Sequence, residues 1–461
     1  MNWLWIVLAL LQAPPASVVP PTAGRGYYAS PSGSRAGDGS ERRPWDLATA
    51  LAGGAGRVQP GDTIWLRAGT YRGAFRSAVA GRPGLPVVVR QFPGERAVID
   101  GASSRSDTWQ VKGEYSVFWG FEVTNSDPRR EAKRPGLIVN YAAHTKFINL
   151  IVHDGGVAFY TDAKYADVEI AGCIIYNNGW RDPEHGKGHA HGLYIKSYTG
   201  PLVARDNVVF NQFGYGIHAF TNASTGKLMN ITIEGNVSFN NGSHAERRTL
   251  TANILLGGDG YAAGATIRNN MTYFSPVLRA EANVIVGWRT LRNGDVVVER
   301  NYFAGGSPVF RFGYWTAARV SDDTLIGIGS RGPLVSQREP GARGQIWRNN
   351  VELTAPPSKT RVFVRPNPYE TGRAHVVVYN WGRQADVDVD VGGVLAPGDR
   401  YEVRNVQDLF GAPVLRGTVS GSVISIPMRG VQPAAPIGLA TSPAPQTGPE
   451  FDTFLVTRTS P

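Results

Sequence analysis

The chain has 461 residues with 56 Gly and 31 Pro, and only 18% of its residues are charged, a turn-rich composition that argues against long helices. A single cysteine, Cys173, excludes an internal disulfide framework and a cysteine-ligated zinc site. The net charge of +10 favours an anionic partner. Because the arginines are spread along the chain without a dense basic arm, we expect an acidic polysaccharide and no nucleic acid.

The N-terminus reads MNWLWIVLALLQAPPAS, an apolar core from Trp3 to Leu11 followed by small residues. That pattern is typical of a secretory signal peptide, which we place at residues 1–23. The apolar run is too short to span a bilayer as a helix, and no later segment qualifies. We therefore expect a secreted or periplasmic protein without membrane anchorage.

Residues 44–54, PWDLATALAGG, are predicted to form a short helix. Their apolar residues keep helical spacing over about two turns, and a terminal Gly follows.

Eight segments then share one pattern of Asn or Gly, a short apolar strand, and a turn of Asn and Gly. They begin at Gly120, Asn149, Gly172, Asn207, Asn236, Asn270, Asn301 and Asn350. An irregular repeat of this kind predicts a parallel β-helix, one coil per repeat, over residues 24–357. None of these eight segments keeps a 3.6-residue period, which excludes helical repeats. Asn207, Asn236 and Asn270 should occupy equivalent corners, where stacked Asn side chains can bond in a ladder.

From about Arg361 the apolar residues alternate with period two between Pro and Gly turns, as in AHVVVYNW and ADVDVDV. This predicts a small antiparallel β-sandwich over residues 358–461. We expect the sandwich to cap the open end of the solenoid rather than to bind carbohydrate separately.

The opening YYASPSGSRAGDGSERRPWDLATAL, the following VQPGDTIWLRAGTY and the coils HGLYIKS and GYGIHAF resemble secreted bacterial right-handed parallel β-helix proteins of the pectate-lyase-like superfamily. The resemblance covers roughly residues 25–355. It implies an all-β fold whose first coil is capped by the helix at 44–54. The superfamily holds pectate lyases, other polysaccharide lyases, mannuronan epimerases and some glycoside hydrolases, so activity must be argued from residues.

A second strand recurs in the coils at residues 136–140, 156–162, 192–197, 216–221 and 252–257. Side chains alternate between the two faces of a strand, and we take Leu137, Val157, Leu193, Ile217 and Ile254 as inward. The outward set is then Asn140, Tyr160, Asp162, Tyr194, Lys196, His218, Phe220 and Asn253. These side chains should stack on adjacent coils at the spacing of neighbouring strands.

The coils differ in length at one junction, just before this strand. The inserted segments are SDPRREAKRP (126–135), GWRDPEHGKGHA (179–190) and GSHAERRTLT (242–251). Because the junction is the same, residues 178–190 and 241–251 should flank one groove on the side that carries Tyr194. The segments add Arg181, His189 and Arg247 to the candidate site.

This set of residue types suits β-elimination on a uronic acid, which needs a cation for the carboxylate, a base for the carbon-five proton and an acid for the leaving oxygen. Lys196 is the candidate base if neighbouring cations depress its pKa. His218 or Tyr194 is the candidate second proton-transfer group, and Arg181 or Arg247 the neutralising cation. His191 is a further catalytic candidate, although its parity with Leu193 fits a core histidine equally. The candidate substrate contacts are Tyr160, Asp162, Arg181, His189, Phe220, Asn253 and Arg247.

Other chemistries stay open. Glycoside hydrolysis needs two carboxylates, for which Asp162, Asp182, Glu184 and Asp259 are the candidates. A carbon-five epimerase shares the first step of elimination, and a polysaccharide-binding solenoid needs no chemistry. His185, His189 and His191 are candidate metal ligands, although we expect no cofactor and leave assistance by Ca²⁺ open. The preferred interpretation is a monomeric polysaccharide lyase.

Overall fold

The computed structural model describes residues 24–102, 104–185, 187–222, 226–245, 251–278, 282–288, 292–329, 332–337, 346–439 and 444–459. The expected signal peptide at 1–23 and the candidate Arg247 lie outside these residues. Across the described ranges, no helix combines the length and the apolar character that a membrane crossing requires.

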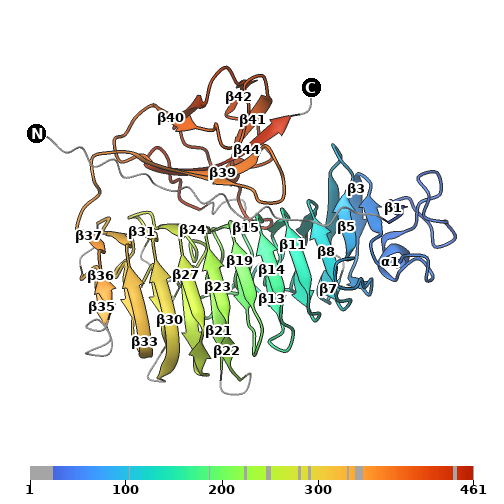
Figure 1. Cartoon of the computed structure of the whole chain (residues 1–461), viewed down its shortest axis with the longest axis horizontal. Helices are drawn as coiled ribbons and strands as arrows, with labels where there is room; N and C mark the ends of the chain where they lie inside the picture. The colour runs from blue at the N-terminus through green and yellow to red at the C-terminus, as the bar shows by residue number, and fades with distance from the viewer. Residues whose placement is uncertain are drawn as a thin grey trace, which may run out of the picture.

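The N-terminal three quarters of the described chain wind into a parallel β-helix with three long sheets (Figure 1). The first sheet contains, in spatial order, β1 (Gly26–Ala29), β2 (Thr63–Leu66), β5 (Val87–Gln91), β8 (Ser116–Trp119), β11 (Thr145–Ile148), β14 (Val168–Ala171), β19 (Leu202–Arg205), β23 (Ile231–Glu234), β27 (Ala265–Arg268), β30 (Asn293–Glu299), β33 (Trp315–Ser321) and β36 (Trp347–Arg348).

The second sheet carries the candidate site. It contains β4 (Phe75–Ser77), β7 (Trp109–Val111), β10 (Ile138–Asn140), β13 (Phe159–Thr161), β18 (Leu193–Ile195), β21 (Ile217–Thr221), β25 (Ile254–Gly258), β29 (Val284–Val286), β32 (Phe310–Phe312) and β35 (Val335–Gln337). The third contains β3 (Gly69–Arg72), β6 (Ala97–Asp100), β9 (Glu122–Thr124), β12 (Ile151–His153), β15 (Ile174–Tyr176), β20 (Val208–Phe210), β24 (Val237–Phe239), β28 (Met271–Tyr273), β31 (Tyr302–Ala304), β34 (Thr324–Ile326) and β37 (Val351–Leu353). Two further pairs, β16 (Trp180–Asp182) with β17 (Lys187–His189) and β22 (Leu228–Met229) with β26 (Ala262–Ala263), lie outside these sheets.

The helix α1 (Leu47–Leu51) forms within the segment where the sequence predicts one. The Asp46 side chain accepts a hydrogen bond from the backbone N–H of Thr49 and so satisfies one of the free donors at the helix start. Leu47, Ala50 and Leu51 are buried in the same apolar core that fills the solenoid. Its role as a cap of the first coil stays a prediction.

The asparagine ladder is present. Asn207 Nδ2 donates to Asn236 Oδ1 at 2.9 Å, and Asn236 Nδ2 donates to Asn270 Oδ1 at 3.0 Å. Asn270 and Asn301 repeat the contact, and Asn301 Nδ2 then donates to Oδ1 of Asp323 at 2.8 Å. The equivalent corners expected for Asn207, Asn236 and Asn270 are therefore confirmed.

Two details of the predicted repeat are wrong. Strand register pairs Ile151 with Ile174 and Ile174 with Val208, so Asn149 and Gly172 precede the ladder position by one residue. Both have positive φ, 53° and 67°, which explains why Asn and Gly also mark that position. A whole coil was missed between Asn301 and Asn350, because Asp323 replaces Asn in the ladder there.

The C-terminal part is antiparallel, as expected. One sheet contains β38 (Arg361–Pro366), β39 (Arg373–Tyr379), β44 (Phe451–Thr459), β41 (Arg400–Asn405) and β42 (Leu415–Thr418), with the 3-10 turn η1 (Val406–Asp408) after β41. The other pairs β40 (Asp386–Asp390) with β43 (Val423–Pro427), and both sheets share one apolar core.

Its expected position at the open end of the solenoid is wrong. Tyr379, Trp381 and Phe451 pack on the outer face of the third sheet, in one cluster with Tyr176, Phe210 and their neighbours along the axis. Figure 1 accordingly shows β39 and β44 above the side of the solenoid rather than beyond β37. The apolar outer face of the third sheet is what attracts the C-terminal part, since such a face is unfavourable in water.

Candidate active site

The outer face of the second sheet brings most of the predicted residues together. Parallel register aligns one row of outward side chains across successive strands: Gln110, Val139, Tyr160, Tyr194, His218, Leu255 and Ile285. Two residues further along each strand, a second row follows: Lys112, Tyr141, Asp162, Lys196 and Phe220. The predicted adjacency of Tyr194, Lys196 and His218 is thus confirmed.

Two residues of the predicted outward set lie inside instead. Asn140 pairs in register with Thr161, and its Nδ2 donates inward to the carbonyl of Ala142. The prediction counted the alternation of side chains from Leu137, but the strand begins at Ile138, and both residues are buried. Alternation counted from Ile138 places Val139 outward and Asn140 inward. Asn253 belongs to a second buried ladder, in which Asn241 Nδ2 donates to its Oδ1 and its own Nδ2 donates to Asn283 Oδ1. Neither residue can contact a substrate on the outer face.

Lys196 is buried, with 4% of its surface exposed, which corrects the expectation of a solvent-facing side chain. Its Nζ lies 4.3 Å from the ring centroid of Tyr194 and 5.1 Å from that of Tyr160. Burial lowers the pKa of Lys196, and the nearby charge of Asp162 opposes this only in part. Among the described residues its amine makes no ion pair, and its neighbours are the faces of these two rings.

Aromatic rings surround His218. The imidazole stacks on Tyr194, Tyr215 and Phe220, with ring centroids 5.1, 4.5 and 4.7 Å away, and the ring of His191 lies at 4.3 Å. Burial lowers the pKa of both histidines, that of His191 to about 3. Both rings are therefore neutral at neutral pH. His191 is half-buried beside Tyr194 and His218 of the first row rather than in the apolar core.

The two tyrosines of the first row keep their protons. Burial raises the pKa of Tyr194, and burial with the charge of Asp162 raises the pKa of Tyr160 to about 12. Their rings meet edge to face at 5.6 Å. A neutral phenol is a hydrogen-bond donor and a proton donor, so this pair can act on an oxygen of a bound sugar.

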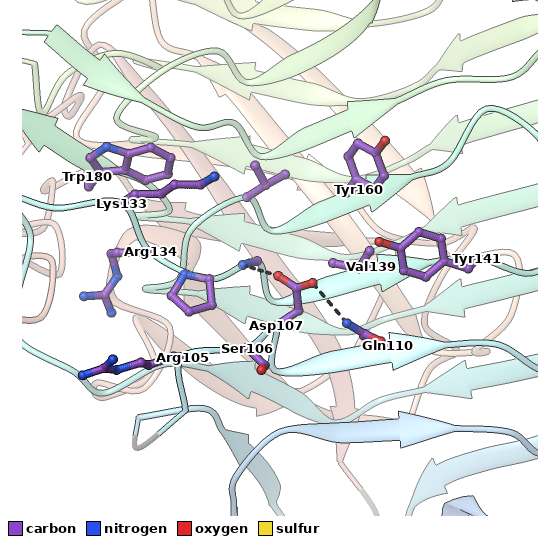
Figure 2. Close-up of a pocket in the computed structure, with 13 residues that line it drawn as sticks. Arg105, Ser106, Asp107, Gln110, Lys133, Arg134, Val139, Tyr141, Tyr160 and Trp180 are labelled. Carbon is purple, nitrogen blue, oxygen red and sulfur yellow. Dashed lines mark hydrogen bonds between the residues drawn. The ribbon is translucent and has the colours of Figure 1, made fainter. Parts of the chain in front are cut away.

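A pocket of about 630 Å³ opens beside Tyr160. It extends toward the N-terminal coils, over β7, β10 and β13, and so ends one coil before β18, which carries Tyr194. Figure 2 shows Trp180 and Lys133 along one side and Tyr141 and Tyr160 along the other. The carboxylate of Asp107 accepts hydrogen bonds from the backbone N–H of Gly136 and from the side-chain amide of Gln110, as the dashed lines in Figure 2 mark.

Sequence reasoning missed the cations of this pocket. Arg105 and Lys133 line it, are exposed, and have no ion-pair partner among the described residues. Lys112 adjoins it on the second row, with its Nζ 3.4 Å from the ring centroid of Tyr141. For Lys133 the signal was the inserted segment 126–135 that contains it; for Lys112 it was the strand period, which continues back through WQVK, in a coil before the first repeat that the pattern marked.

The inserted loops do lie at one corner and touch each other. Arg181 donates from Nε to the carbonyl of His244 at 3.0 Å, which joins residues 178–190 to the described part of 241–251. The ring of Trp180 stacks on that of His189 at 5.4 Å. Arg181 is thus engaged in holding the loops, which weakens its assignment as the neutralising cation.

The predicted histidine metal site does not form among the described residues. His185 Nδ1 and His189 Nε2 both approach Asp182, at 2.8 and 3.4 Å, whereas His191 lies against His218. Asp182, Glu184 and His185 do come within 4.8 Å of one another, on the exposed tip of the β16–β17 hairpin. That group is an exposed acidic cluster without further support as a metal site.

The candidate carboxylates do not form a hydrolase pair on the sheet. Asp162 and Asp259 follow β13 and β25, which are three strands apart, about 14 Å at the usual strand spacing. Asp182 and Glu184 are close enough, but hydrogen bonding from His185 lowers the pKa of Asp182 to about 2. A glycosidase acid needs a raised pKa instead.

Comparison with known proteins agrees with this fold. A pectate disaccharide-lyase of Dickeya chrysanthemi is 25% identical over 258 residues, which are 54% of this chain and 30% of that protein. Pectate lyase L of Thermoclostridium stercorarium is 24% identical over 296 residues, 60% of this chain and 22% of that protein. The chain therefore matches less than a third of the length of these curated relatives.

A solved rhamnogalacturonan lyase superposes with a TM-score of 0.52 at 18% identity, over 71% of this chain and 87% of that one. At this identity the likeness shows the fold alone. Residues 27–278 match the family profile described as "Pel9A-like, right handed beta helix region". Since this match covers more than half of the 461 residues, the chain belongs to the Pel9A-like right-handed β-helix family, whose relatives here are distant pectate lyases.

Proposed function

We propose that the chain is a polysaccharide lyase that cleaves a uronic-acid-containing polymer by β-elimination on the outer face of the second sheet. One observation carries the proposal: a buried lysine amine, Lys196, stands without an ion pair among described residues between two neutral tyrosines. The names of the distant relatives, which are pectate lyases, support the same class of substrate.

Lys196 acts as the base. Desolvation lowers its pKa, so a larger fraction of the amine is neutral near neutral pH than in a solvated lysine. The neutral amine takes the proton from carbon five of the uronate, and the electron pair forms the double bond between carbons four and five. The bond from carbon four to the glycosidic oxygen then breaks.

Tyr194 is the favoured acid for the leaving oxygen. Its raised pKa keeps the phenol protonated, and its ring adjoins the Lys196 amine. His218 is less suited than the sequence indicated, because Nδ1 is buried without a partner among described residues and the ring is enclosed by aromatic neighbours. We assign His218 and Phe220 to holding Tyr194 in place.

Lys112, Lys133 and Arg105 supply positive charge for substrate carboxylates in place of Arg181. A polymer lying along the second sheet would meet them on the N-terminal side of Tyr160. Tyr160, Tyr141 and Trp180 offer ring faces to the sugars. An extracellular polymer as substrate agrees with the export signal expected at residues 1–23, and we propose that the enzyme acts as a monomer outside the cytoplasm.

The test is incubation with a panel of uronate polymers while absorbance from unsaturated products is recorded. Elimination raises this absorbance; hydrolysis yields reducing ends without it, epimerisation leaves chain length unchanged, and a binding protein does none of these. Lys196→Ala and Lys196→Arg should each lower turnover about a hundredfold or more, the usual worth of a positioned general base. Lys164→Ala, an exposed lysine of the neighbouring turn, is the control and should keep wild-type turnover. Wild-type rates in both Lys196 variants would remove Lys196 as the base.

A further inference from the structure

A short segment of the C-terminal part reaches the corner from which the pocket loops project. Residues 434–438, called the strap below, are anchored at one end by Ala434, whose backbone N–H donates to the carbonyl of Gln407 at 2.8 Å. From there the strap contacts loops that precede the second sheet in three different coils. Those loops include Lys133 and Trp180, which line the pocket.

Arg130 is the first point of contact. Its guanidinium is 1% exposed, pairs with Asp154, and donates from Nε to the carbonyl of Ile437 at 2.7 Å. Nη1 donates to the carbonyl of Gly179 at 2.9 Å, while the N–H of Ile437 donates to Asp154 at 2.8 Å. One side chain thus joins the loop at 126–135, the start of the loop at 179–190, and the strap.

Asn177 is the second point of contact. Its Nδ2 donates to the carbonyl of Ala434 at 2.8 Å, so its Oδ1 is left to accept from Nε2 of His244 at 3.1 Å. The carbonyl of His244 in turn accepts a hydrogen bond from Nε of Arg181. Through this one buried amide the strap therefore also supports His244, in the described start of the loop at 241–251.

Gly438 is the third point of contact, and its backbone needs glycine. It has φ of +87°, and a Cβ at this position would lie 1.8 Å from the carbonyl oxygen of Pro128. The strap is in direct van der Waals contact with the base of the loop that carries Lys133. Any side chain there must push the strap and the loop apart.

We propose that the strap is a positioning element for substrate binding, through which the C-terminal part sets the place of Lys133 and Trp180 in the pocket. The substrate readout rests on the proposed function. Because the strap contacts loop bases rather than Lys196 or Tyr194, its disturbance should weaken binding and leave the chemical step intact.

Gly438→Ala tests this, and Gly430→Ala is the matched control. Gly430 also has positive φ, +70°, but a Cβ there meets Gly448 of the C-terminal part at 3.4 Å, in ordinary contact. Both changes carry a similar backbone cost, and only the first presses on Pro128. Steady-state kinetics on the best uronate polymer and amide hydrogen exchange of residues 126–135 and 177–185 are measured for both.

For Gly438→Ala we expect KM to rise about fivefold or more with kcat within about twofold of wild type, since displaced positioning groups weaken binding. Exchange in both loop segments should become about tenfold faster. Gly430→Ala should show neither change. Equal KM and equal exchange in the two variants would overturn the proposal, as would loss of kcat with unchanged KM in Gly438→Ala.

If Gly438→Ala does not fold, Arg130→Lys is compared with Arg129→Lys, an exposed arginine of the same loop, under the same two criteria. Hydrogen exchange needs no substrate. Should the wild-type protein fail to cleave any uronate polymer, the lyase proposal falls and the exchange difference alone decides the role of the strap.

Discussion

Asp323→Asn should stabilise the protein at neutral and alkaline pH. Asp323 stands in the buried ladder where every neighbouring rung carries Asn, and its Oδ2 has no hydrogen-bond partner among the described residues. In the other rungs Nδ2 donates to a carbonyl of the first sheet, as Asn301 does to Ile267 and Asn350 to Val320. An amide at 323 would find the carbonyl of Val298, which pairs in register with both.

The magnitude follows from the pKa. Burial raises the pKa of Asp323 from 3.8 to about 7, so the folded state prefers the protonated acid. The favourable contribution is present below pH 3.8 and is lost as pH rises toward 7. At 1.36 kcal/mol per unit, the wild-type chain loses about 1.5 kcal/mol by pH 5 and about 4 kcal/mol by pH 8 relative to its fully protonated form. Asp323→Asn has no such loss.

The assay is urea unfolding of both proteins at pH 5 and pH 8. The stability gap between Asp323→Asn and wild type should widen by about 2.5 kcal/mol between these two values, because all other groups titrate alike in both proteins. Asp322→Asn removes the charge of the exposed neighbouring residue, which is only a minor cause of the raised pKa of Asp323, and should therefore widen the gap far less than Asp323→Asn does. A constant gap, or a less stable Asp323→Asn at pH 8, would refute the reasoning.

The remaining predictions concern other parts of the solenoid. Asn236→Ala should lower the free energy of unfolding by about 3 kcal/mol or more, measured by urea unfolding, because it strands buried ladder partners on both sides; full retention of stability would show that the ladder is dispensable. The hydrogen bonds that His153 donates to Asp154 and Glu122 outweigh burial and raise its pKa to about 9, so this pairing stabilises the fold below pH 6.5 and the stability is lost as pH rises through 9. Thermal melts of His153→Gln should lack that alkaline decline, and an unchanged decline would assign it to another group. Lys112→Ala should raise KM for a uronate polymer with kcat nearly unchanged, in kinetics run beside Lys164→Ala; identical KM values would exclude Lys112 from carboxylate binding.

The β-helix could be predicted from the sequence because few protein architectures combine short repeated strands with Asn at the corners. In a parallel β-helix, equivalent positions of successive coils lie side by side. Tyr160, Tyr194 and His218 could therefore be aligned from the sequence alone. Alternation failed where a strand begins at a corner: Asn253 has the outward parity of its strand but turns into the buried ladder.

Burial and docking could not be read from the pattern. Lys196 occupies an outward position, yet aromatic rings from its own and the neighbouring strands cover it. The C-terminal part was predicted as a separate antiparallel unit, but period-two strands contain no signal for the surface that receives them. The coil that contains Asp323 was missed because the repeat was defined by Asn. The carboxylate oxygen of Asp323 nevertheless accepts the same ladder hydrogen bond as an Asn side chain does.

Because the C-terminal part packs along several successive coils, it constrains how many coils that stretch of the solenoid can have. Its aromatic residues contact strands of the third sheet from Tyr176 to Ile326, so inserting or deleting a coil in that span would shift every contact beyond the change by one strand. The loops before the second sheet can therefore change in length without shifting these contacts, whereas the solenoid between β15 and β34 is held to one number of coils. A graft of foreign loops onto this scaffold should begin and end at the junction just before the strands of the second sheet.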